Sequence, residues 1–223
     1  MKTALMALLV VTSANAEEFK YDPNTPEARA VQAKYAAFEQ EALALPTSDL
    51  FKELQRIDAS REAKTAIQKP EDALKNMWMF GQNDDDKKSI SFATVLEKRS
   101  ESGEVAASFY NSVYQWRYCN MWLRQNTSQA DKLATECWQK VMAGFKRASE
   151  ANIGDASSNI ARMYASGFGV TPSKFVAAEW YVKAADQYKT RKDRDEALTA
   201  VEAALNLVPD HPAALRLRKA MVK

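Results

Sequence analysis

The sequence predicts an all-α fold, with helical-hairpin repeats forming an α-solenoid in the C-terminal half and an all-helical region before them. The 223-residue chain has only six glycines and seven prolines, which is few for the many turns of a β-sandwich or barrel. Residues of high helix propensity, such as alanine, leucine, lysine and glutamate, are abundant throughout. Apolar residues also recur at helical spacing along most of the chain.

The first sixteen residues have the pattern of a removable signal peptide. Lys2 precedes an apolar run over residues 4–11, and Ala14 and Ala16 supply the small residues of a cleavage site. We therefore expect cleavage near Ala16 and a periplasmic or secreted protein. The remaining sequence has no apolar run near the ~20 residues that span a bilayer, so we expect no membrane insertion.

The exported chain is almost electrically neutral. Removing residues 1–16, and Lys2 with them, leaves 30 of 31 basic residues against 29 acidic ones, so the net charge falls from +2 to +1. Such a balance gives nucleic acid little electrostatic reason to bind. We expect no nucleic-acid partner.

Capping residues and prolines divide the first helical region, residues 17–103. Thr25 and Pro26 have the pattern of an N-cap followed by proline at the first helical position, and that helix ends before Pro46. A second helix is capped by the residues after Pro46 and ends at Pro70. Its apolar positions are Leu50, Leu54 and Ile57. A short segment over residues 71–81 follows it.

Residues 82–88, with the sequence QNDDDKK, are predicted to form a solvated loop. Three aspartates raise the possibility of a calcium site. The segment lacks the alternating oxygen ligands and the distant glutamate of an EF-hand, and two lysines follow at once. We expect no metal here, and a helix near residues 90–98 that is followed by a break at Gly103.

A repeat domain is predicted over residues 104–223, and it begins with a disulfide-linked hairpin over residues 104–151. Its first helix is rich in aromatic residues nearly all round, which is typical of a helix buried between neighbours. Cys119 and Cys137 lie nine residues before and nine residues after Ser128, which caps the second helix. An antiparallel hairpin would bring the two cysteines together. Export favours a disulfide over two free thiols, and a metal site would need more ligands than this region has.

The stretch SGFGVTPSK contains Gly167 and Gly169 and is predicted to be a turn between helices. It has neither the GxGxxG pattern of a dinucleotide site nor the GxxxxGK[ST] pattern of a Walker loop. Helical periodicity flanks it on both sides, and downstream it places Phe175, Ala178 and Ala185 on one face. We therefore expect structural glycines with left-handed backbone and no cofactor.

This region resembles two related repeat families. Residues 154–188 resemble a Sel-like repeat, although Ser173 replaces the usual aspartate and Ala161 the usual glycine. Residues 178–211 are similar to a 34-residue tetratricopeptide unit, and residues 212–223 would then form a capping helix. The Sel-like match rests on Ala156, Ile160, Tyr164, Gly167, Gly169, Val170, Ala177, Trp180, Lys183, Ala184 and Ala185, and the tetratricopeptide match on Tyr181, Ala184, Ala185, Tyr188, Ala197, Val201, Ala204 and Pro209. The two matches share the helix over about residues 174–189, which is second in its pair in one family and first in the other.

The tetratricopeptide register implies a groove that binds a protein or peptide partner. It gives the packing positions to Ile160, Ala161, Tyr164, Tyr181, Ala184, Ala185 and Tyr188. The polar positions left to face the groove are Asp155, Ser158, Arg162, Glu179, Asp186 and Lys189.

Catalytic residues are not expected. The one histidine, His211, lies in an LVPDHP turn and has no serine or cysteine nucleophile in a recognisable motif with it. We expect an exported repeat protein that mediates protein–protein interactions, such as a periplasmic adaptor or assembly factor, and not an enzyme. Two alternatives stay open: a cell-wall-binding protein or small hydrolase with its site in residues 17–103, and an exported effector or immunity-type protein.

Overall fold

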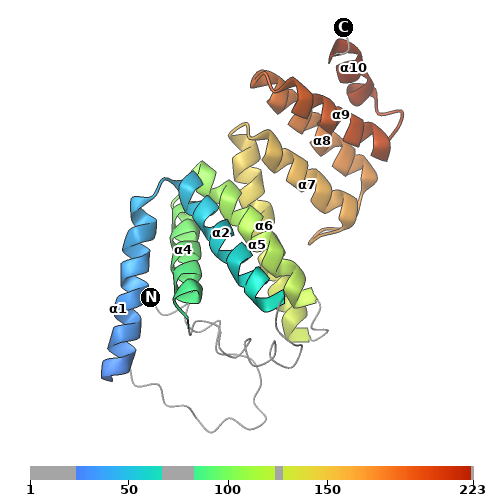
Figure 1. The fold of residues 1–223 in the computed structure, drawn as a ribbon. Helices are drawn as coiled ribbons and strands as arrows, with labels where there is room; N and C mark the ends of the chain where they lie inside the picture. The colour runs from blue at the N-terminus through green and yellow to red at the C-terminus, as the bar shows by residue number, and fades with distance from the viewer. Residues whose placement is uncertain (1–23, 67–82, 124–127, 222–223) are drawn as a thin grey trace. The chain divides into compact units, whose positions relative to one another are not determined.

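The computed structural model confirms an all-α protein with hairpin packing between consecutive C-terminal helices. It describes residues 24–66, 83–123 and 128–221, and these residues contain helices and no strand (Figure 1). The predicted signal peptide, the segment 71–81 and the predicted turn at residues 126–127 lie outside the described residues. The helices are α1 (Pro26–Ala44), α2 (Thr47–Ala66), α4 (Asp84–Glu101), α5 (Val105–Leu123), α6 (Ser128–Glu150), α7 (Gly154–Ser166), α8 (Lys174–Thr190), α9 (Arg194–Leu207) and α10 (Pro212–Met221).

The chain divides into two compact units, and each is described by itself. The first unit comprises residues 1–98 and the second residues 99–223. The division lies within the last turn of α4, close to the predicted domain boundary after residue 103. The candidate site lies in the second unit.

Capping explains where α1 begins and ends. The Thr25 hydroxyl accepts a hydrogen bond from the backbone N–H of Ala28 at 3.1 Å, and Pro26 occupies the first helical position. Leu45 has extended backbone, as expected of a residue that precedes proline. In α2, the predicted apolar residues Leu50, Leu54 and Ile57 are all buried.

The prediction of a solvated loop over residues 82–88 is wrong, because α4 begins at Asp84. The side chain of Asn83 accepts a hydrogen bond from the N–H of Asp86 at 2.8 Å and caps the helix. Three aspartates in the first turn then interact favourably with the positive end of the helix dipole. Asp86 and Lys87 are buried, so the later part of this segment is packed, whereas Asn83 and Asp84 are exposed.

Polar contacts hold α1 and α2 to α4 within the first unit. Lys34 on α1 pairs with Asp84 at 2.7 Å, and Lys88 on α4 pairs with Glu41 at 2.6 Å. Lys98 and Glu39 form a further pair between α4 and α1. Between α2 and α4, the Ser89 hydroxyl donates to the Asp58 carboxylate at 3.2 Å.

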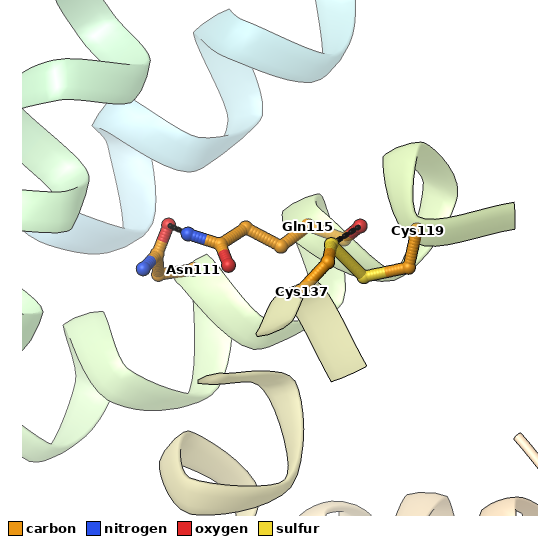
Figure 2. The surroundings of a disulfide bond; sticks show 4 residues. All are labelled: Asn111, Gln115, Cys119 and Cys137. Atoms are coloured by element: carbon orange, nitrogen blue, oxygen red, sulfur yellow. Dashed lines mark hydrogen bonds between the residues drawn. A yellow bond between two sulfur atoms is a disulfide. The ribbon is translucent and has the colours of Figure 1, made fainter. Parts of the chain in front are cut away.

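Helices α5 and α6 form a closely packed antiparallel hairpin. A side chain at Gly144 on α6 would lie 2.1 Å from the Ser112 hydroxyl and 2.8 Å from the Ser108 carbonyl oxygen on α5. Cys119 and Cys137 are joined by a disulfide between the same two helices, as their placement predicts (Figure 2). The Sγ of Cys137 also lies 3.9 Å from the carbonyl oxygen of Gln115, which is a contact because a disulfide sulfur has no proton to donate.

Glycines shape the turn between α7 and α8. Gly167 ends α7 with φ +76° and Gly169 has φ +67°, a region that side chains disfavour. A Cβ atom at Gly169 would lie 2.2 Å from the Cβ of Trp138 on α6. Ser173, which stands where the Sel-like family has aspartate, begins α8 by accepting a hydrogen bond from the N–H of Val176 at 3.3 Å.

Two apolar clusters form the core of the second unit. One joins α8, α9 and α10 and is built from alanines, Val201, Leu205 and Met221. The other joins α5, α6 and α7, and its buried aromatic members are Trp138 and Phe145. Five partly buried rings, one of them from α8, pack against it: Phe109, Trp116, Tyr164, Phe168 and Trp180. Consecutive helices from α5 to α10 pack against one another, so α8 contacts both α7 and α9 (Figure 1).

The aromatic helix α5 and the start of α8 are less buried than their patterns predict. Phe109, Val113 and Trp116 on α5 are half-buried and pack against the second cluster. Phe175, which the helical period places with Ala178 and Ala185, is 56% exposed although both alanines are fully buried.

We expect Gly169→Ala to destabilise the second unit more than Gly103→Ala. Both glycines have positive φ, but a Cβ at Gly103 meets nothing within 4 Å. Backbone strain alone would cost about 1 kcal/mol at either position, and displacement of Trp138 would add about 2 kcal/mol at Gly169. Urea unfolding followed by tryptophan fluorescence measures the difference, and equal costs would contradict the close contact with Trp138.

We expect the Cys119–Cys137 disulfide to stabilise the hairpin by about 3 kcal/mol in the chain-entropy model, given its sequence separation of 18 residues. Thiol titration of the denatured, unreduced protein should find almost no free thiol. A Cys119→Ala/Cys137→Ala variant should unfold at lower urea concentration than the oxidised protein and should no longer respond to reductant. Two titratable thiols in the unreduced protein would refute the bond.

Candidate functional site

An open groove of about 520 Å³ runs along one face of α8 in the second unit. The α8 residues that line it are spaced three or four apart, as one helix face requires. The groove is lined by Glu179, Val182, Lys183, Asp186, Gln187 and Thr190 of α8, with Asn152, His211 and Ala213 from other segments. Asn152 follows α6, and His211 and Ala213 lie at the start of α10.

Hydrogen bonds fix the end of the groove near Asn152. The amide of Asn152 donates to the Thr190 hydroxyl at 2.9 Å. The Gln187 amide nitrogen donates to the carbonyl oxygen of Ser149 at 2.6 Å, and its amide oxygen accepts from the Ser157 hydroxyl at 2.6 Å. The bonds of Gln187 join α6, α7 and α8 through buried polar groups and so make this end of the groove rigid, whereas the Asn152–Thr190 bond lies at the surface.

Glu179 and Asp186 give the middle of the groove its charge. Both are exposed, and neither makes a hydrogen bond or ion pair to any residue that the structure describes. Lys183 lies between them in the sequence, but its ammonium nitrogen is 4.7 Å from the centre of the Trp180 ring. The lysine is therefore held in a cation–π contact and leaves both carboxylates unneutralised.

His211 and Phe175 lie together at the α10 side of α8. Their ring centres are 5.6 Å apart, and His211 is buried whereas Phe175 is exposed. The Nδ1 atom of His211 accepts a hydrogen bond from the N–H of Ala214 at 3.4 Å and so caps α10. This interaction gives His211 a structural role in the helix start.

The six predicted groove residues occupy four different environments. Glu179 and Asp186 line the groove, and Lys189 is exposed in the last turn of α8, where its charge is favourable to the helix dipole. The guanidinium carbon of Arg162 lies 5.6 Å from the centre of the Trp116 ring. The remaining two, Asp155 and Ser158, contact α8.

Tyr188 accounts for the orientation of Asp155 and Ser158. Its hydroxyl donates to the Asp155 carboxylate at 2.6 Å. Burial is the main cause that raises the pKa of Tyr188 above its ordinary value. The hydrogen bond to Asp155 raises this pKa further, and a hydrogen bond with Ser158 lowers it. The tyrosine ring also covers Gly154, where a Cβ atom would lie 2.7 Å from a ring carbon. Asp155 and Ser158 therefore join α7 to α8.

Sequence reasoning missed seven of the nine groove residues, four on α8 and three outside it: Val182, Lys183, Gln187, Thr190, Asn152, His211 and Ala213. The last three lie outside α8. Each belongs to a turn or helix start that tertiary packing brings beside α8. The helical period of α8 could have identified Val182, Lys183 and Thr190, because they share a face with Glu179 and Asp186.

Within the described ranges, no group of three histidine, cysteine, aspartate or glutamate side chains could hold a metal ion. None of the helices in those ranges is long and apolar enough to cross a bilayer. Comparisons of the chain with protein-family models, with curated proteins and with solved structures found no match.

We expect Tyr188→Phe to lower the free energy of unfolding by about 1 kcal/mol at neutral pH, through loss of a hydrogen bond to a solvent-exposed carboxylate. Because the folded-state pKa of Tyr188 lies above its ordinary value of 10.0, the phenol stabilises the fold fully below pH 10 and loses this effect as pH rises further. The difference between the two proteins should therefore shrink above pH 10. Tyr181→Phe is the matched control.

Tyr181 is half-buried on the same helix and makes no hydrogen bond to any described residue. Its substitution should change stability by less than that of Tyr188. Equal effects of the two substitutions would show that the bond to Asp155 contributes nothing.

Proposed function

We propose that the chain is an exported helical-repeat protein whose C-terminal helices bind another protein, as a periplasmic adaptor or assembly factor does. The observation that carries this proposal is the open groove along α8, which has a rigid polar end, two unpaired carboxylates and an exposed phenylalanine beside it. Helical repeats offer concave surfaces of this kind to protein partners.

The groove also bears on the relationship to the repeat families. Its lining residues come from α8, from the turn between α6 and α7, and from the start of α10. Helices α7 and α9 contribute none of them. Of the helices themselves, only α8 and the start of α10 therefore border the groove. In our proposal, α8 is the groove-facing helix of a tetratricopeptide-like pair with α9, and α7 is the outer partner of α6.

Partner capture tests this proposal. Residues 17–223 are immobilised and exposed to an envelope extract, and bound proteins are identified by mass spectrometry. We expect one reproducible partner whose recovery falls at least tenfold with the isosteric variant Glu179→Gln/Asp186→Asn, if the two carboxylates are interface hot spots.

The matched control is Glu136→Gln/Asp195→Asn, which neutralises two exposed carboxylates that do not line the groove. It should capture the partner as the unaltered chain does, and both variants should melt within a few degrees of it. Equal capture by all three proteins would place the interface elsewhere. Retention on murein without a protein partner would favour the cell-wall-binding alternative.

A further inference from the structure

We propose that the α8 groove binds an extended peptide segment that carries two basic side chains three residues apart, flanked by a bulky apolar side chain. This inference rests on the proposed function and specifies the chemistry of the partner. Three features of the groove support it: the spacing of its two carboxylates, their freedom from internal ion pairs, and the exposed aromatic residue beside them.

The spacing of the carboxylates selects the conformation of the ligand. Glu179 and Asp186 are seven residues apart on α8, which corresponds to a rise of about 10.5 Å. In a polyproline II segment, side chains on the same side recur every three residues, about 9.3 Å apart. In a β-strand, side chains on the same face are about 6.8 or 13.6 Å apart, for separations of two or four residues. These distances match the rise between the two carboxylates less well. Lysine or arginine side chains can span the small difference between the polyproline II repeat and the rise between the carboxylates.

Lys183 is placed so that it does not compete with a basic ligand. It stands four residues after Glu179 and three before Asp186, the separations at which helical ion pairs form. Its contact with the Trp180 ring takes the ammonium group instead, so neither pair is formed. Two basic side chains of a ligand can therefore bind, one at each carboxylate.

Each uncharged polar side chain of the groove already makes at least one hydrogen bond within the chain. The amide of Asn152 donates to the Thr190 hydroxyl. The amide of Gln187 bonds to Ser149 and Ser157, and the Nδ1 atom of His211 accepts a hydrogen bond from the N–H of Ala214. Charge is therefore the main polar signal that the groove offers to a partner. Because the carboxylates are exposed, the interaction should weaken as salt concentration rises.

An apolar contact is available beside the charged pair. Phe175 precedes Glu179 by one helical turn and is 56% exposed. Its ring rests against His211, and Leu215, one turn further along α10, is 37% exposed. A leucine, isoleucine or aromatic residue of the peptide would cover this surface and exclude water from it.

Phage display of random twelve-residue peptides tests the inference on immobilised residues 17–223. We expect enriched peptides with two lysines or arginines three apart and a bulky apolar neighbour. The most enriched peptide, synthesised with blocked ends and a fluorescent label, should bind Glu179→Gln/Asp186→Asn at least tenfold more weakly in fluorescence anisotropy. It should bind Phe175→Ser several-fold more weakly and Glu136→Gln/Asp195→Asn as it binds the unaltered chain.

Each other outcome overturns the inference in an identifiable way. Enriched acidic or uncharged peptides that lose binding in the groove variant would refute the basic ligand and leave the groove as a protein-binding site. Enriched basic peptides that bind all variants equally would place their site outside the groove. Failure to enrich any peptide would refute an extended ligand, and the capture experiment would then decide the proposed function independently.

Discussion

The contact between Gly169 and Trp138 constrains the rest of the second unit. Trp138 is almost fully buried on α6, and the turn between α7 and α8 lies directly on its indole because residue 169 has no side chain. Phe168 stacks on the same indole with ring centres 5.3 Å apart, and Trp116 on α5 meets both rings edge-on. The turn between α7 and α8 thereby fixes these two helices on the hairpin of α5 and α6, and α9 and α10 follow from the position of α8.

A small cluster of buried polar groups also fixes the relative placement of α6, α7 and α8. The hydroxyls of Ser149 and Ser157 lie 2.7 Å apart, and the Gln187 amide bonds to Ser157 and to the Ser149 backbone. Buried polar groups cost free energy unless they are paired, and pairing requires one relative placement of the three helices. The Trp138 Nε1–H, by contrast, is buried without a partner among the described residues, so packing of its ring outweighs one unmade hydrogen bond.

Local signals explain which parts of the fold could be predicted from the sequence. Thr25 and Gly167 act within one turn of their own position, and the helix limits that they predict agree with the structure. The start of α4 was missed because acidic residues favour both loops and first helical turns, and the capping bond from Asn83 decides between them. The groove was predictable only along α8, where periodicity operates. Asn152 and His211 reach it through packing between distant segments, and Tyr188 holds Asp155 across two helices, for which no short-range pattern exists.

Helix α1 of the first unit and helix α8 of the second are held by different forces, and this difference bears on where binding is best supported. Helix α1 buries only Ala28 and Ala42, while Val31 and Leu43 remain exposed, and its bonds to α4 are mainly ion pairs near the surface. Exposed pairs of this type contribute about 0–1 kcal/mol each and weaken with salt. The groove instead stands on α8, whose alanines are fully buried between α7 and α9 and whose polar end is closed by hydrogen bonds. A surface that is ordered before its ligand arrives loses less entropy on binding. Helix α8 is therefore better suited to recognition than the ion-paired helix α1.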